Sequence, residues 1–125
     1  MSMPLDWEKA LQNADGSEEL LLELAGVFID ECPEMMRQIR AAIDTSDASA
    51  LQLAAHSLKG STRIFAATAA TDTALRLEAM GAETRLQDAE GAWSALMPEI
   101  ERLTMALAER IAGENPERET NPQGQ

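Results

Sequence analysis

The residues best suited to chemistry lie in one short segment, AAHSLKGSTRIF, at positions 54–65. His56 is the only histidine among 125 residues, and Lys59 and Gly60 follow it within about one helical turn. An imidazole can carry a proton or a covalent group near neutral pH, and a lysine one turn away can neutralise an anion bound to it. Glycine inside a helix costs about 1 kcal/mol relative to alanine, so Gly60 needs a functional or packing reason. Its missing side chain would let another protein approach the imidazole. A histidine, a cation and a steric gap together suit transient phosphorylation.

Other chemistries fit the segment less well. A lone histidine on a helix is most often an ordinary polar surface residue, and that interpretation stays open for His56. A zinc site needs three or four nitrogen or sulfur ligands, which one histidine and Cys32 do not supply. Ser57 or Ser61 could belong to a catalytic triad, but no nucleophile elbow or oxyanion hole accompanies them. The seven glycines form no phosphate-binding motif, so a phosphoryl group would have to arrive from another protein.

The composition predicts an all-α protein with a single core. Hydrophobic residues make up 45% of the chain but aromatic residues only 3%, and alanine, leucine and methionine replace the usual strand-forming residues. The net charge of −12 argues against binding to a nucleic-acid backbone or to anionic lipid. We expect no membrane insertion and no signal peptide, and therefore a cytoplasmic protein. Cys32 has no partner for a disulfide and is expected to be a small core residue.

Capping residues and apolar periodicity divide the chain into helices. Asp6 caps a short first helix, Ser17 opens a long one that continues through Pro33, and Asp47 opens the helix that carries His56. The helices are expected over 4–16, from 17 to about 43, from 47 to about 65, over 66–81 with an end near Gly81, and from about 88 onward. Short connections predict an up-and-down antiparallel four-helix bundle with a short additional N-terminal helix. We assign the bundle to residues 1–112 and a disordered polar tail to 113–125.

The third helix separates a core face from the face that carries His56. At about 100° per residue, the core stripe falls within roughly 80° of the helix circumference. It comprises Leu51, Ala55, Leu58, Thr62 and Phe65. On the same projection His56 lies about 140° from Leu51 and Gly60 about 180°. The histidine is therefore predicted to face away from the core.

The segment AAHSLKGSTRIFAA resembles the histidine phosphotransfer (HPt) family, whose signature is a histidine followed by x-Leu-Lys-Gly-Ser on an exposed helix face. SEELLLELAGVFIDECPEMMRQIRAAI is similar to the family's long second helix, and ALRLEAMG to the helix after the histidine. The resemblance extends over about 100 residues and implies a four-helix bundle in a two-component phosphorelay.

The resemblance implies a role for four residues. His56 would be the phosphoacceptor, exchanging a phosphoryl group with the phospho-aspartate of a response-regulator receiver domain. Lys59 would stabilise the phosphoryl oxygens, and Gly60 would give room to the receiver's loops. Glu78 would accept the Nδ1 proton of the imidazole and leave Nε2 as the nucleophile. The chain would be a phosphocarrier without an ATP site, and Mg²⁺ would come from the receiver, so we expect no metal or cofactor here.

The same resemblance implies a receiver-docking surface around the histidine. Its residues would be Leu53, Ser57, Gly60, Arg63 and Ile64. The sequence departs from the family here, because members often have a small residue, an asparagine and a glycine at the positions of Arg63, Ile64 and Ala66. Arg63 would add a phosphate contact or only tune the choice of regulator. Ile64 would join Leu53 and Gly60 in an apolar patch or, alternatively, pack against a neighbouring helix.

The expected partners are receiver domains of response regulators and a hybrid sensor histidine kinase, with a monomeric phosphocarrier between them. One alternative is a non-catalytic helical scaffold that binds a receiver without phosphotransfer. Another is the dimerisation helix pair of a sensor kinase, but there an acidic residue usually follows the histidine, whereas Ser57 follows His56. The relay interpretation accounts best for the motif together with the bundle pattern.

Overall fold

The computed structural model describes residues 3–114, and within this range the chain forms five helices and no strand. The helices are α1 (Trp7–Asn13), α2 (Glu18–Asp44), α3 (Ala48–Ile64), α4 (Thr68–Ala82) and α5 (Ala89–Glu114). The predicted tail, 113–125, therefore begins inside α5, and residues 115–125 lie outside the described part of the chain.

Three helices begin at the caps that the sequence predicted. The side chains of Asp6, Ser17 and Asp47 each accept a hydrogen bond, 3.1 Å long, from the backbone N–H three residues further on. Such caps satisfy donors that have no partner inside the helix. α4 follows Ala67, which offers no side-chain cap.

The connections between the helices turn through residues with positive φ. Ser46, Ala66 and Thr84 have φ of 54°, 53° and 55°, at the ends of α2, α3 and α4. The next residue in each case donates its backbone N–H to the carbonyl five positions earlier, as Ala67 does to Thr62 at 3.2 Å. This is the Schellman arrangement, which usually uses glycine at the left-handed position.

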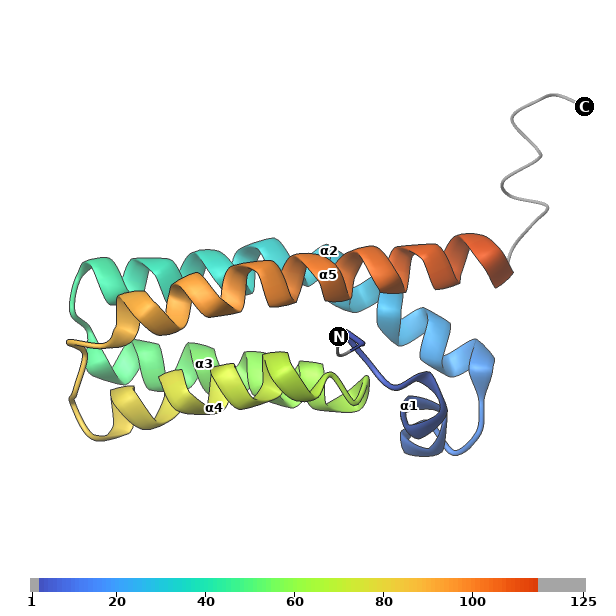
Figure 1. The fold of residues 1–125 in the computed structure, drawn as a ribbon, viewed down its shortest axis with the longest axis horizontal. Coiled ribbons are helices and arrows are strands. Elements are labelled where there is room, and N and C mark those ends of the chain that lie inside the picture. The colour runs from blue at the N-terminus through green and yellow to red at the C-terminus, as the bar shows by residue number, and fades with distance from the viewer. Residues whose placement is uncertain (1–2, 115–125) are drawn as a thin grey trace, which may run out of the picture.

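The four long helices form the predicted antiparallel bundle (Figure 1). Each packs against two neighbours, so that the order around the bundle is α2, α3, α4, α5. α2 and α5 continue through Pro33 and Pro98 and have 27 and 26 residues, against 17 and 15 in α3 and α4. The longer pair extends past the shorter one, and α1 lies beside this extension (Figure 1). No helix among residues 3–114 is both long and apolar enough to span a bilayer.

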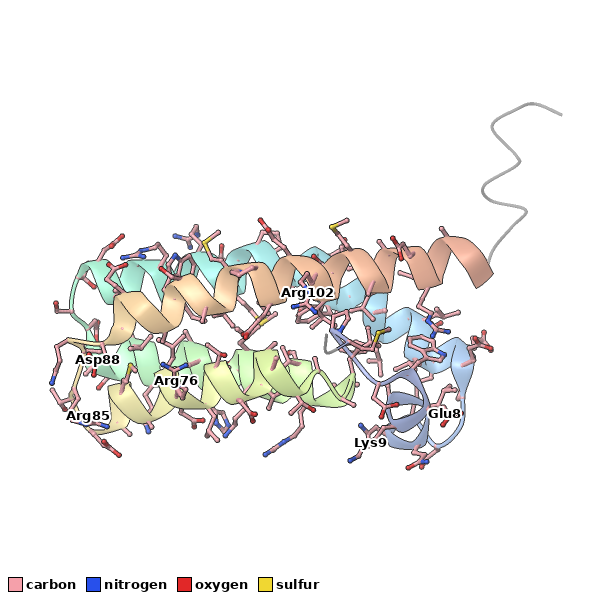
Figure 2. All side chains as sticks on the ribbon, in the orientation of Figure 1. Glu8, Lys9, Arg76, Arg85, Asp88 and Arg102 are labelled. Carbon is pink, nitrogen blue, oxygen red and sulfur yellow. The ribbon has the colours of Figure 1, made fainter. Side chains whose placement is uncertain are left out.

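Two polar or charged side chains help to fix α1 at this end of the bundle. The guanidinium of Arg110 on α5 lies over the Trp7 ring, 4.5 Å from its centroid. The Asn13 amide donates to the carbonyls of Arg63 and Ile64, at 3.4 and 3.0 Å, and so satisfies acceptors at the C-terminal end of α3. Glu8 and Lys9 lie on the exposed side of α1, whereas Arg85 and Asp88 lie at the opposite end of the bundle (Figure 2).

The core stripe predicted for α3 is confirmed, since all five of its residues are buried. Phe65 packs against Phe28 of α2, with ring centroids 5.6 Å apart. The buried Thr62 hydroxyl is 2.8 Å from that of Thr71, so a hydrogen bond joins α3 to α4. Cys32 is buried as expected, and burial raises the pKa of its thiol.

The prediction that α4 ends near Gly81 is confirmed, since the helix ends at Ala82. Gly81 itself, however, is a buried residue within the helix. A Cβ atom at Gly81 would lie 2.6 Å from the backbone nitrogen of Gln52 and 2.7 Å from the carbonyl oxygen of Ala48. The glycine is therefore required by the close approach of α4 to α3, not by a helix terminus.

Candidate functional site

His56 lies in the middle of α3 with its side chain 65% exposed, as the helical projection predicted. Its Nδ1 atom is 2.8 Å from Oε2 of Glu78 on the neighbouring helix α4. The two residues are 22 positions apart in the chain, and the packing of α3 on α4 brings them together. One ring nitrogen is thus engaged by the protein, while the ring itself is open to solvent.

Lys59 completes a three-residue group with His56 and Glu78. Its Nζ atom is 2.7 Å from Oε1 of Glu78, so each oxygen of the carboxylate has its own partner. The side chains of Lys59 and Glu78 are only 14% and 17% exposed. The ion pair is therefore largely shielded, in contrast to the exposed imidazole.

The surroundings of Glu78 favour its ionised form. Lys59 is the largest influence that lowers the pKa of Glu78, and the hydrogen bond with His56 lowers it further. Burial opposes both, since desolvation raises the pKa of a carboxyl group. An ionised carboxylate only accepts hydrogen bonds, so a neutral imidazole beside it carries its proton on Nδ1. The lone pair of this tautomer is then on Nε2.

The residues predicted for docking lie on the outer face of α3, with one partial exception. Leu53 is 70% exposed, and Ser57, Gly60 and Arg63 are also exposed. A Cβ atom at Gly60 would meet nothing within 4 Å, so the steric gap beside the histidine is present. Ile64 is half-buried and packs against the core, which is the alternative left open for it.

A shallow groove between α2 and α3, which no sequence pattern predicted, adjoins this face. Its volume is about 450 Å³, and Leu53 and Ser57 form part of its α3 wall. Arg37, Gln38 and Ala41 contribute from α2. No sequence motif marks these residues. They lie near the site because α2 pairs antiparallel with α3.

A larger cleft, of about 1080 Å³, lies elsewhere in the described chain. Trp7, Asp72, Glu109 and Arg110 are among its lining residues, whereas His56, Lys59 and Glu78 are not. Within residues 3–114 no group of three or more histidine, cysteine, aspartate or glutamate side chains is arranged to hold a metal ion.

The site thus combines an exposed histidine on a four-helix bundle with a carboxylate at its Nδ1 atom. The sequence model of the Hpt domain matches residues 23–113, and the chain belongs to this family. α1 and the start of α2 precede the matched region. The resemblance stated from the motif is thereby confirmed, and it places the chain among the histidine phosphotransfer domains of phosphorelays.

Two solved structures have the same fold. The histidine-containing phosphotransfer protein B (HptB) from Pseudomonas aeruginosa PAO1 is 22% identical, with a TM-score of 0.80 over 89% of this chain and 96% of that one. The HPT domain of an Hpt sensor hybrid histidine kinase from Shewanella is 21% identical, with a TM-score of 0.79 over 88% and 95%. No curated protein matches the chain significantly.

Proposed function

We propose that this protein is a phosphorelay intermediate that accepts a phosphoryl group on Nε2 of His56 and donates it onward. The group would be exchanged with the phospho-aspartate of receiver domains, both in response regulators and in a hybrid sensor histidine kinase. The observation that carries the proposal is the contrast between the two ring nitrogens. Nδ1 is held 2.8 Å from a shielded carboxylate, and the ring is otherwise exposed to an arriving protein.

This geometry supports a direct transfer from the receiver's phospho-aspartate to the imidazole. The Nε2 lone pair attacks the phosphorus of the acyl phosphate, a P–N bond forms, and the P–O bond to the receiver's aspartate breaks, releasing its carboxylate. The ring gains positive charge in this step, and the Glu78 carboxylate stabilises that charge while Nδ1 keeps its proton. Phosphoryl transfer depends chiefly on positioning and electrostatics, and the fixed ring supplies the positioning. Donation to a second receiver is the reverse reaction.

We assign receiver docking to the face made by Leu53, Ser57, Gly60 and Arg63. Leu53 offers an exposed apolar contact, and the missing Cβ at Gly60 lets receiver loops approach the imidazole. The groove between α2 and α3 continues this face away from the histidine. The Mg²⁺ ion of the reaction would belong to the receiver. The protein would act in the cytoplasm as a monomeric phosphocarrier without ATP-dependent activity.

The test is incubation with a phosphorylated receiver domain and Mg²⁺, followed by intact-mass analysis. The expected product gains the mass of one phosphoryl group, which acid removes and alkali spares. His56→Ala should retain the helical circular dichroism spectrum, because the side chain is 65% exposed, and should gain no phosphoryl group. Receiver binding without any mass gain in the unmodified protein would contradict the proposal and support a scaffold.

A further inference from the structure

The ammonium group of Lys59 is already engaged in the structure. It lies 2.7 Å from Oε1 of Glu78, and both side chains are largely shielded from water. The sequence assigned Lys59 to the phosphoryl oxygens, and that direct contact stays a prediction. In the structure, Lys59 and His56 instead contact different oxygens of the same carboxylate, Oε1 and Oε2 of Glu78.

This arrangement gives Lys59 an effect on the imidazole that needs no contact with phosphate. A carboxylate taken partly out of water needs a compensating charge, and among the described ion pairs only Lys59 supplies a permanent one to Glu78. The pair also fixes the position of the carboxylate, so that Oε2 stays within hydrogen-bond distance of Nδ1. Loss of the ammonium would free Glu78 to rotate toward water and to release the ring.

We propose that Lys59 is a positioning residue that promotes phosphoryl transfer by holding Glu78 against Nδ1 of His56. The inference rests on the proposed function of His56. It assigns the lysine to the orientation and tautomer of the nucleophile and not to the oxygens of the transferred group.

A double-mutant cycle separates the two roles. The rate of phosphoryl gain from a phosphorylated receiver with Mg²⁺ is measured for the unmodified protein, Lys59→Met, Glu78→Gln and the double variant. The amide oxygen that Glu78→Gln introduces can accept a hydrogen bond from the Nδ1–H group, and a neutral amide needs no compensating cation. Lys59→Met should slow transfer about tenfold with Glu78 present and change it less than about twofold in the Glu78→Gln background. An equal loss in both backgrounds would show direct action on the phosphoryl group and overturn the proposal.

Nitrogen-15 NMR of the imidazole provides a second readout that does not require transfer. The single histidine gives one pair of ring nitrogens, whose shifts report which nitrogen carries the proton. Lys59→Met should lower the population with the proton on Nδ1, whereas Lys9→Met, at an exposed lysine of α1, should leave it unchanged. An unchanged tautomer in Lys59→Met together with slower transfer would contradict the positioning role.

The two measurements keep this inference separate from the assignment of His56. If the unmodified protein gained no phosphoryl group from any receiver, the proposed function would fail, and the role of Lys59 in transfer would fail with it. The NMR comparison would still decide whether Lys59 controls the imidazole. If transfer occurs, the cycle decides how Lys59 contributes to it.

Discussion

Gly81 of α4 lies directly against Gln52 of α3, closer than any residue with a side chain would allow. A Cβ atom at Gly81 would be 2.6 Å from the Gln52 nitrogen. Both residues are one turn from the functional site, since Gly81 follows Glu78 by three positions and Gln52 precedes His56 by four. The contact therefore sets the separation of the two helices where the Glu78 carboxylate meets the imidazole.

Gly81→Ala should destabilise the protein, although alanine is the better helix former. The added methyl group would meet two backbone atoms that cannot rotate away, and such overpacking typically costs about 1–3 kcal/mol. Gly26→Ala in α2 is the matched control, because its Cβ would meet nothing within 4 Å. Urea unfolding should give a lower free energy of unfolding for Gly81→Ala and an equal or higher one for Gly26→Ala. Equal stabilisation by both would show that the helices have room at Gly81.

Gly60, in contrast to Gly81, has open space where a side chain would lie. Substitutions at Gly60 should therefore affect receiver docking without unfolding the bundle. Nothing lies within 4 Å of a Cβ there, so Gly60→Ala should stabilise the helix by about 1 kcal/mol. Gly60→Glu should leave the bundle folded but weaken receiver binding about tenfold or more, because its side chain would occupy the gap beside His56.

The control for this effect is Gly91→Glu, which adds the same charge to an exposed glycine of α5. Receiver affinity, measured by titration calorimetry, should be unchanged in that variant. Equal affinity of Gly60→Glu and the unmodified protein would place the docking surface elsewhere.

The fold was predictable because its determinants are local. Asp6, Ser17 and Asp47 cap helices within three residues of themselves, and the apolar spacing of α3 gives its buried face directly. The role of Gly81 was not predictable, because the atoms that exclude a side chain there come from another helix. A glycine near a helix end is more often a terminator, and that rule located the end of α4 to within one residue but did not give the reason for the glycine.

The functional site likewise has features that follow from one helix and features that depend on a contact between two helices. The exposure of His56 and the gap at Gly60 follow from the periodicity of one helix. The partner of Nδ1 came only from family resemblance, since Glu78 reaches His56 across a helix–helix contact. That Lys59 is paired with the same carboxylate was not predicted, because spacing along α3 places the lysine near the histidine and gives no information about α4.

Ala66→Gly should stabilise the protein. Ala66 has φ of 53°, a conformation that costs a residue with a side chain about 1–2 kcal/mol and costs glycine almost nothing. The greater freedom of glycine in the unfolded chain offsets part of this gain, so we expect a net increase of about 0.5–1 kcal/mol in the free energy of unfolding. Ala108→Gly, at an exposed position inside α5, should decrease it by about 1 kcal/mol. Thermal unfolding of both variants checks the sign, and a loss in both would show that Ala66 is not strained.

Acid should destabilise the bundle partly through Glu78. Its pKa is lowered in the folded protein, mainly by Lys59, so the unfolded chain binds more protons as the pH falls into the range where glutamate titrates. The stability that Glu78 contributes is therefore complete above the ordinary glutamate pKa of about 4.3 and is lost as the pH drops through the lowered value. Removing the cation in Lys59→Met should raise the pKa of Glu78 and reduce this contribution.

The measurement is the free energy of unfolding in urea at a series of pH values from neutral down to the acid transition. The Lys59→Met variant should be less stable than the unmodified protein at neutral pH. The difference should shrink as Glu78 becomes protonated, because a neutral carboxyl group no longer forms an ion pair with the ammonium. Lys9→Met, whose lysine is exposed on α1, should follow the unmodified protein throughout. A stability difference for Lys59→Met that stayed constant with pH would mean that Lys59 contributes by packing alone and that its charge does not act on Glu78.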